Sequence, residues 1–231
     1  MKTRVFVFLL SLLLLLPLAS CAGERYDALY VTDADNGLTY SVRGSGTKAR
    51  QITVKRGEEL LFAEKIKVDK KVGRLGGSYG FEVIDLNFDG LLDMMIVDQV
   101  AGEQKRYLCW LANADGTYTK SEELSGLCNL QADTKLEAIR SFTHTFTREK
   151  AYQDVAAATI STDAATQYVW VDGVLTPNVR VSITYYSETA RYCYSVSYYD
   201  KEAKAFSDSD DKWLTPEEYR EYDMSFLYYF R

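Results

Sequence analysis

An acidic loop between two apolar runs is the feature that most constrains how this chain can fold. Residues 85–93 read D-L-N-F-D-G-L-L-D, with Val83-Ile84 before them and Met94 to Val97 after them. Apolar and β-branched residues on both sides, without a sustained 3.6-residue period, predict strand–loop–strand rather than helix. The segment therefore indicates a hairpin in a β-rich domain, with a tightly curled loop joining its two strands.

Side chains that carry oxygen recur along this loop at regular positions. Asp85, Asn87, Asp89 and Asp93 stand at loop positions one, three, five and nine. A curling backbone can aim these four side chains, together with the carbonyl of Leu91, at one centre. Hard oxygen donors suit Ca²⁺, which takes about 6–8 of them, and Gly90 permits the sharp turn that this needs. We therefore predict a Ca²⁺ site; the alternative is a solvated hairpin turn without an ion.

The loop does not fit the helix–loop–helix type of calcium site. That motif requires a bidentate Glu at position twelve, where this chain has Ile96 inside an apolar run. Nothing in the loop supplies a general base or a nucleophile. We expect the ion to be structural, joining two strands, rather than catalytic.

The N-terminus has the composition of an export signal. Lys2 and Arg4 precede an apolar run from Val5 to Leu16, which is too short to span a membrane as a helix. Leu18-Ala19-Ser20-Cys21 looks like a bacterial lipobox. We predict a signal peptide over residues 1–20, acylation at Cys21, and a lipid-anchored tether over residues 21–26. The alternative is an ordinary secretory signal that is cleaved near a cysteine.

The charge of the chain excludes some partners. Removal of residues 1–20 leaves 25 basic residues against 33 acidic ones, a net charge of −8. This balance argues against nucleic acid as a partner and against electrostatic binding to anionic lipid. It permits a basic protein partner, because complementary fields speed association.

Three cysteines follow Cys21. A Cys109–Cys128 disulfide is chemically permitted outside the cell and would stabilise the fold by about 3 kcal/mol. The alternative is that Cys109, Cys128 and Cys193 are all buried thiols. The spacing matches no C-x-x-C zinc or redox motif.

The rest of the chain alternates short β-forming runs with turns. Asp35-Asn36-Gly37, Asp172-Gly173 and the region from Asp200 to Ala203 are turn signals. Strand plus turn repeats at about ten residues, as in antiparallel sandwiches, barrels and propellers. We predict an all-β, antiparallel fold, with residues 27–231 forming a single domain.

The C-terminal end differs from the rest. Thr215-Pro216-Glu217-Glu218 matches an N-cap, a proline at the first helical position and a capping-box Glu. We predict a short helix from Pro216 toward Asp223. The aromatic tail from Phe226 to Phe230 is expected to pack on the sheet as a strand or hook.

The loop and its surroundings resemble a known family. The loop is similar to the D-x-[DN]-x-D-G-x-x-D calcium loops of FG-GAP and integrin-type β-propeller blades. The order of motifs over roughly residues 80–150 also resembles exported bacterial proteins with a small β-propeller-like fold, a family that includes a periplasmic immunity protein against a lysozyme-like effector. These motifs are Asp85 to Gly90, Tyr107-x-x-Trp110-Leu111, Asp115-Gly116-x-Tyr118, Ser121 to Ser125 and Asn129. The resemblance implies a β-propeller-like fold and the calcium ligands, but it matches no inhibitory loop.

Catalysis has little support in the sequence. His144 is the one histidine, so a hydroxyl–histidine–carboxylate triad would need all its base chemistry from that residue. A lone histidine in a strand is more often a bystander. Two carboxylates can hydrolyse a glycoside, but Glu122 and Glu123, if they lie in a strand, would point to opposite faces. We therefore predict that the protein is not an enzyme.

Two binding functions remain. The first is an inhibitor or immunity-type protein of the cell envelope, directed against a lysozyme-like hydrolase. The alternative is a cell-surface module for carbohydrate or protein that inhibits nothing. It would use the tyrosines of the C-terminal third, which include Tyr185, Tyr186, Tyr192, Tyr194, Tyr198 and Tyr199. Tyrosines can stack on sugars or anchor a partner, although packing between strands is their commoner role.

Overall fold

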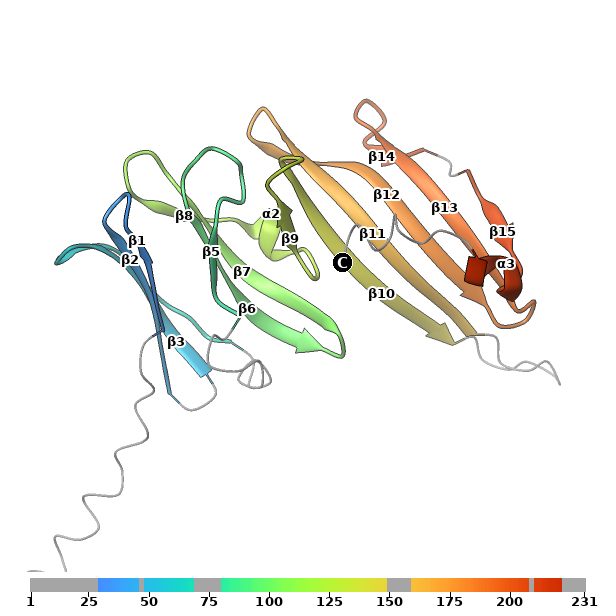
Figure 1. Ribbon diagram of the computed structural model, residues 1–231, viewed down its shortest axis with the longest axis horizontal. Coiled ribbons are helices and arrows are strands. Elements are labelled where there is room, and N and C mark those ends of the chain that lie inside the picture. Colours follow the sequence, from blue (N-terminus) through green and yellow to red (C-terminus); the bar gives the residue numbers. More distant parts are fainter. Residues whose placement is uncertain (1–28, 46–47, 69–79, 149–158, 208–209, 222–231) are drawn as a thin grey trace, which may run out of the picture. The chain divides into compact units, whose positions relative to one another are not determined.

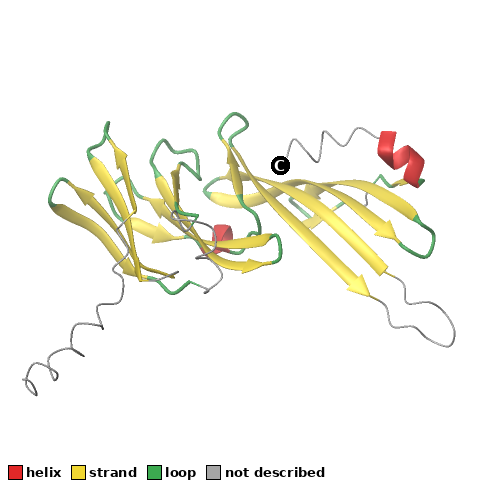
Figure 2. Ribbon diagram, turned by 60° about the horizontal axis from the view of Figure 1, so that its bottom comes forward, coloured by secondary structure: helices red, strands yellow, loops and turns green. Residues whose placement is uncertain are grey.

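The protein is described here from a computed structural model, which places residues 29–45, 48–68, 80–148, 159–207 and 210–221. In these ranges all strands pair antiparallel and form three sheets, with two short helices beside them (Figures 1 and 2). The predicted all-β, antiparallel class is confirmed. The aromatic tail from Phe226 to Phe230, which is expected to pack on the sheet, lies outside the described residues.

The chain divides into two compact units, Met1–Tyr79 and Gly80–Arg231, where the sequence predicted one domain over residues 27–231. The division follows from strand pairing, because every described strand before residue 79 pairs only within its own sheet. A glycine-rich stretch with Gly73, Gly76 and Gly77 precedes the boundary. The single domain over residues 27–231 stays a prediction, and within it the chain forms these two compact units.

The first unit contains one four-stranded meander. Its strands are β1 (Leu29–Asp33), β2 (Leu38–Ser45), β3 (Lys48–Arg56) and β4 (Glu59–Lys65), paired in chain order. Tyr40 lies opposite Val54, and Val42 lies opposite Ile52. All four side chains are fully buried. The period of two in the sequence therefore gives this sheet one apolar face.

The second unit begins with another four-stranded meander. Its strands are β5 (Glu82–Ile84), β6 (Asp93–Ala101), β7 (Gln104–Ala112) and β8 (Tyr118–Lys120). Ile84 pairs with Asp93, so residues 85–92 form the connection that the sequence predicted as a loop. The run from Met94 to Val97 is buried on both faces of β6. This explains why it is continuously apolar rather than alternating.

The third sheet has seven strands and fills the rest of the second unit. From one edge its order is β14, β13, β12, β11, β10 and β9, and β15 also pairs with β13. The strands are β9 (Gln131–Asp133), β10 (Ala138–Arg148), β11 (Thr159–Val171), β12 (Val174–Tyr186), β13 (Arg191–Asp200), β14 (Ala205–Phe206) and β15 (Lys212–Leu214). Figure 1 shows β10, β11, β12 and β13 as the long neighbouring strands of this sheet.

The segment between β8 and β9 links the two sheets of the second unit. Cys128 forms an isolated antiparallel bridge with Arg106 of β7. Its carbonyl oxygen accepts hydrogen bonds from the Ser141 hydroxyl at 2.8 Å and from the Phe142 N–H at 3.0 Å, both on β10. The backbone at residue 128 thus contacts β7 on one side and β10 on the other.

One turn design recurs in three hairpins. In each, an Asp side chain accepts hydrogen bonds from the N–H groups two and three residues later, and the residue four positions on has positive φ. The three pairs are Asp33 with Gly37, Asp133 with Glu137, and Asp200 with Lys204. Asp side chains favour such turns because they mimic a backbone acceptor. The two-residue turn at Asp172-Gly173 has φ of 51° and 76°, as a type I′ hairpin requires.

Both helices are short and begin at hydroxyl side chains. In α3 (Pro216–Glu221) the Thr215 hydroxyl accepts from the Glu218 N–H at 3.2 Å, and the Glu218 carboxylate accepts from the Thr215 N–H at 2.7 Å. The predicted capping box is confirmed, and Asp223 lies beyond the described residues. In α2 (Glu122–Ser125), Ser121 is the N-cap. Glu122 and Glu123 therefore lie in a helix and not in a strand.

Candidate functional site

The Asp85–Asp93 loop curls around the side chain of its first residue. The Asp85 carboxylate accepts hydrogen bonds from the N–H of Asp89 at 3.2 Å and from the N–H of Gly90 at 2.8 Å. Gly90 has φ of 85°, so the sharp turn predicted there is confirmed. Phe88 also has positive φ, at 60°, which is uncommon for a bulky residue. The loop backbone is thus held in a closed curl by its own carboxylates.

Asn87 places one unpaired oxygen inside this curl. Its amide nitrogen donates to Asp89 Oδ2 at 2.9 Å, but its Oδ1 is buried and accepts no hydrogen bond. The other Asp89 oxygen accepts the Leu91 N–H at 2.8 Å. A buried carbonyl oxygen without a partner costs free energy, and it marks the place where a cation would be stabilising.

Asp93 is the fully buried member of the set. Its two carboxylate oxygens accept from the N–H of Leu86 at 2.6 Å and from the N–H of Ala112 at 2.7 Å. Burial raises the pKa of Asp93 to about 7; the two backbone donors oppose this rise, and the charges of Asp85 and Asp89 add to it. Asp93 therefore joins the loop to β7. None of the groups that shift the pKa of Asp93 is a cation.

The donor chemistry of the loop fits a calcium ion, although the side chains are occupied with one another. Among the described residues, no three His, Cys, Asp or Glu side chains are grouped as they would be around a metal. Each carboxylate still has lone pairs beyond the N–H bonds it accepts, and Asn87 Oδ1 accepts none. Asp85, Asn87, Asp89 and Asp93, with the Leu91 carbonyl, would hold the ion, which would supply charge neutralisation rather than chemistry.

The N-terminal predictions fall outside the described residues. Residues 1–28, which include the lipobox and Cys21, are not placed. In the described part of the chain, no helix is long and apolar enough to cross a membrane.

The three later cysteines are buried free thiols, so the Cys109–Cys128 disulfide is absent from this structure. Cys128 lies opposite Arg106, whereas Cys109 stands three positions further along β7. Three strand positions span about 10 Å and reverse the face, while a disulfide needs Cα atoms within about 7 Å of each other. Burial also raises the pKa of Cys109 to about 12.

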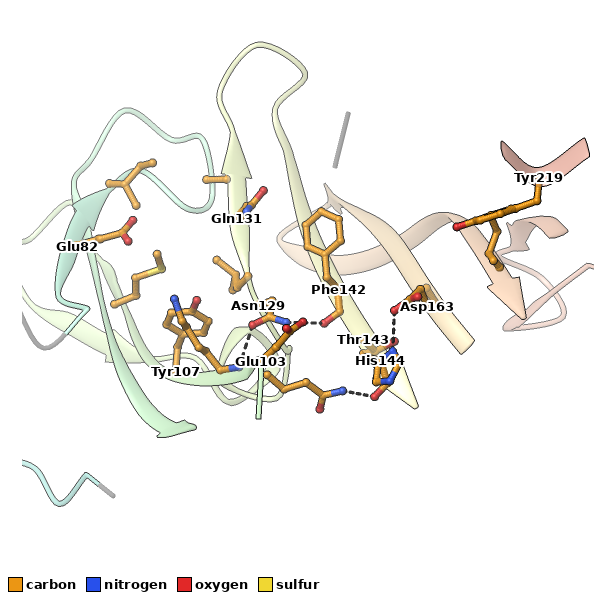
Figure 3. A pocket seen from close by; sticks show the side chains of 18 residues that line it. Glu82, Glu103, Tyr107, Asn129, Gln131, Phe142, Thr143, His144, Asp163 and Tyr219 are labelled. Carbon is orange, nitrogen blue, oxygen red and sulfur yellow. Dashed lines mark hydrogen bonds and ion pairs between the residues drawn. The ribbon is translucent and has the colours of Figure 1, made fainter. Parts of the chain in front are cut away.

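Strand pairing brings together two polar residues that sequence reasoning did not connect. His144 of β10 lies opposite Asp163 of β11, and its Nδ1 is 2.8 Å from an Asp163 carboxylate oxygen. Both side chains are exposed. They line a cavity of the second unit together with Tyr107 and Glu103 (Figure 3). The two residues are 19 positions apart in the sequence and meet only through the register of β10 with β11. No local motif could therefore have revealed the pair.

Several of the C-terminal tyrosines pack against other aromatic rings. The Tyr192 ring stacks on Tyr219 of α3 at 4.0 Å between centroids and lies 4.9 Å from Tyr185. Tyr186 lies 5.2 Å from Trp213. Tyr198 is exposed. Packing between strands therefore accounts for much of this aromatic content.

Comparison with known proteins gives a fold and no family. The chain matches no protein-family model and no curated protein sequence. It is similar to a solved structure described as that of a Xanthomonas Type IV Secretion System related protein. The two share 14% identity with a TM-score of 0.51, over 82% of this chain and 96% of that one. At this identity the likeness concerns the fold alone.

Proposed function

We propose that the protein is a lipid-anchored binding protein of the bacterial cell envelope, stabilised by calcium, that inhibits a lysozyme-like hydrolase. The observation that carries the calcium part is the buried, unpaired Oδ1 of Asn87 inside a loop with three carboxylates. An uncompensated buried oxygen and a buried Asp93 charge both favour a bound cation. Ca²⁺ is the hard cation that accepts such a set of oxygens.

The sheet that carries the loop supports a propeller-like interpretation. Propeller blades are four-stranded sheets, and both β1–β4 and β5–β8 are four-stranded meanders in chain order. The candidate calcium loop joins the first two strands of the β5–β8 sheet. The long strands from β10 to β13 do not follow the blade pattern, so we restrict the propeller-like description to the two meanders.

Three features support the inhibitory role: the net charge of the protein, its expected position at a membrane, and its similarity in fold to a solved structure. A net charge of −8 after removal of the signal would steer the protein toward a basic partner, and many lysozymes are basic. Lipidation at Cys21 would hold it at a membrane next to the cell wall. The solved protein of similar fold is described as related to a Type IV Secretion System, and that description of the other protein is compatible with this role.

Inhibition is tested directly with the full-length protein in detergent. We expect it to bind at least one basic muramidase in a pull-down and to slow that enzyme in a cell-wall lysis assay. A basic protein that is not a hydrolase, such as cytochrome c, controls for nonspecific attraction. If no muramidase is bound or slowed, the inhibitor role is refuted and the surface-module alternative replaces it.

One observation favours that alternative module. Trp213 is 44% exposed, and its ring carries the guanidinium of Arg191 at 5.6 Å from the centroid. An exposed indole beside a tyrosine can stack on a sugar ring. Binding of a neutral glycan that is lost in Trp213→Ala, without any effect on a muramidase, would select this function.

A further inference from the structure

A cavity of about 870 Å³ opens in the second unit, against the start of β7 and the middle of β10 (Figure 3). It is lined by residues from β5 to β7, from β9 and the segment before it, from β10 to β12 and from α3. Its size is that of a ligand site. It is separate from the Asp85–Asp93 loop, because no residue of that loop lines it.

Tyr107 brings a phenol to this cavity. The residue as a whole is only 8% exposed. Burial raises the pKa of Tyr107 to about 12, with a further contribution from the charge of Glu82. A phenol in such a position can accept a hydrogen bond from a ligand, and its ring can face a cation.

The charged groups of the cavity are mostly acidic. The described residues that line it include three carboxylates and one ammonium: Glu82, Glu103 and Asp163 against Lys105. Glu82 and Glu103 form no ion pair within the described residues. Met95, Phe142 and Ile183 add apolar and aromatic surface. An anionic ligand would meet repulsion here, and a neutral sugar would leave the carboxylates without compensation.

We propose that this cavity receives a lysine or arginine side chain of a protein partner. The alkyl part of such a side chain would lie along Phe142 and Ile183. Its cationic head would reach Tyr107 and the carboxylate of Glu82. Glu103 in the β6–β7 turn, and Asp163 paired with His144, would add attraction at longer range. This inference rests on the proposed function, because it names the feature by which a basic partner would be recognised.

The probe is a pair of fluorescent hexapeptides that differ only in charge. One carries two lysines, and in the other both lysines are acetylated. With the full-length protein in detergent, fluorescence polarisation is expected to show binding of the lysine peptide at least about tenfold tighter than that of the acetylated peptide. Equal binding of the two peptides would overturn the proposal, as would binding of chitotetraose in the absence of lysine-peptide binding.

Variants locate the binding. Glu82→Gln with Glu103→Gln is expected to weaken binding of the lysine peptide by about tenfold or more. The first change removes a charge-assisted contact, and the second removes an acidic charge at the edge of the cavity. Tyr107→Phe removes one oxygen and is expected to weaken it by about threefold or more. Glu188→Gln removes an exposed carboxylate in the β12–β13 turn and should leave the affinity unchanged. If Glu188→Gln weakens binding as much as the cavity variants do, the attraction is nonspecific and the proposal is wrong.

The two proposals fail in different ways. If a muramidase is inhibited equally by wild type and by Tyr107→Phe with Glu103→Gln, the inhibitor function stands and the cavity is not its recognition site. If the lysine peptide binds in the cavity but no muramidase is bound, the cavity inference stands and the inhibitor function is refuted. Unchanged thermal melting of each variant shows that a loss of binding does not come from misfolding.

Discussion

The indole N–H of Trp170 donates a hydrogen bond of 2.9 Å to the carbonyl oxygen of Leu86. Trp170 lies near the end of β11, whereas Leu86 is the second residue of the Asp85–Asp93 loop. The N–H of the same Leu86 donates to Asp93. The peptide groups on both sides of Leu86 are thus fixed by side chains, one from the seven-stranded sheet and one from β6. The candidate calcium loop is therefore coupled to both sheets of the second unit.

Replacement of Trp170 by Phe should loosen this coupling. The change keeps an aromatic ring but leaves the Leu86 carbonyl without its donor, which costs about 1 kcal/mol. We expect a lower urea midpoint with an unchanged slope, and weaker calcium stabilisation because the loop backbone is less constrained. Trp213→Phe, at an exposed indole, is the matched control and should change neither quantity.

Calcium removal should lower stability by an amount that depends on calcium concentration. At a free Ca²⁺ concentration of 100 times Kd, a single site adds about 2.7 kcal/mol to the free energy of unfolding. We expect EDTA to lower the melting temperature, and excess Ca²⁺ but not Mg²⁺ at the same concentration to restore it. Asn87→Ala should abolish the response, whereas Asn36→Ala, in a turn without the acidic set, should retain it. If the melting temperature does not change with Ca²⁺ concentration, the calcium site is refuted and the loop is a solvated hairpin turn without an ion.

Asp93→Asn should be more damaging than its near-identical size suggests. The carboxylate accepts one backbone N–H on each oxygen, whereas an amide presents one oxygen and one N–H₂ donor. One of the two buried N–H groups would then lose its acceptor, at a cost of about 1–3 kcal/mol. Chemical denaturation in EDTA measures this cost separately from any lost calcium binding. Asp89→Asn, whose side chain is exposed, should cost less under the same conditions.

Local chemistry accounts for the features that were predictable from sequence. The strand–loop–strand at Asp85–Asp93, the Asp172-Gly173 turn and the Thr215–Glu218 capping box each depend on residues within nine positions of one another. Their hydrogen bonds form wherever the segment is placed, so the sequence is sufficient to predict them. The N-cap at Ser121 belongs to the same class, and the Glu-rich segment after it should have indicated α2.

Long-range register accounts for what was missed. The contact between His144 and Asp163, and the cavity reached by Tyr107, depend on how β10 pairs with β11 and on where the 127–130 segment bridges two sheets. A shift of one residue in that register would turn His144 to the other face. The division at Tyr79 likewise depends on which strands do not pair. None of these long-range relationships has a local sequence motif from which it could be predicted.

Thiol counting distinguishes the two cysteine hypotheses. In a Cys21→Ala variant that is unfolded without reductant, three thiols per chain should react with Ellman's reagent, because Cys109, Cys128 and Cys193 are free. A single reactive thiol would indicate that Cys109 and Cys128 are bridged in the exported protein. In the native state the reaction should be slow at pH 8, because burial raises the pKa of Cys109 to about 12 and also raises that of Cys193, so little thiolate forms.

Lipidation at Cys21 predicts where the protein partitions in a cell. Each buried CH₂ of an acyl chain adds about 0.8 kcal/mol of membrane affinity, so two chains anchor a protein stably where one does not. We expect the wild type in the membrane fraction and Cys21→Ala in the soluble fraction after lysis, measured by immunoblot. Ser20→Ala keeps a small residue before the cysteine and should remain in the membrane. Mass spectrometry of the wild-type N-terminal peptide should find acyl chains on Cys21. An unmodified cysteine, together with a soluble wild type, would show that the signal is an ordinary secretory one.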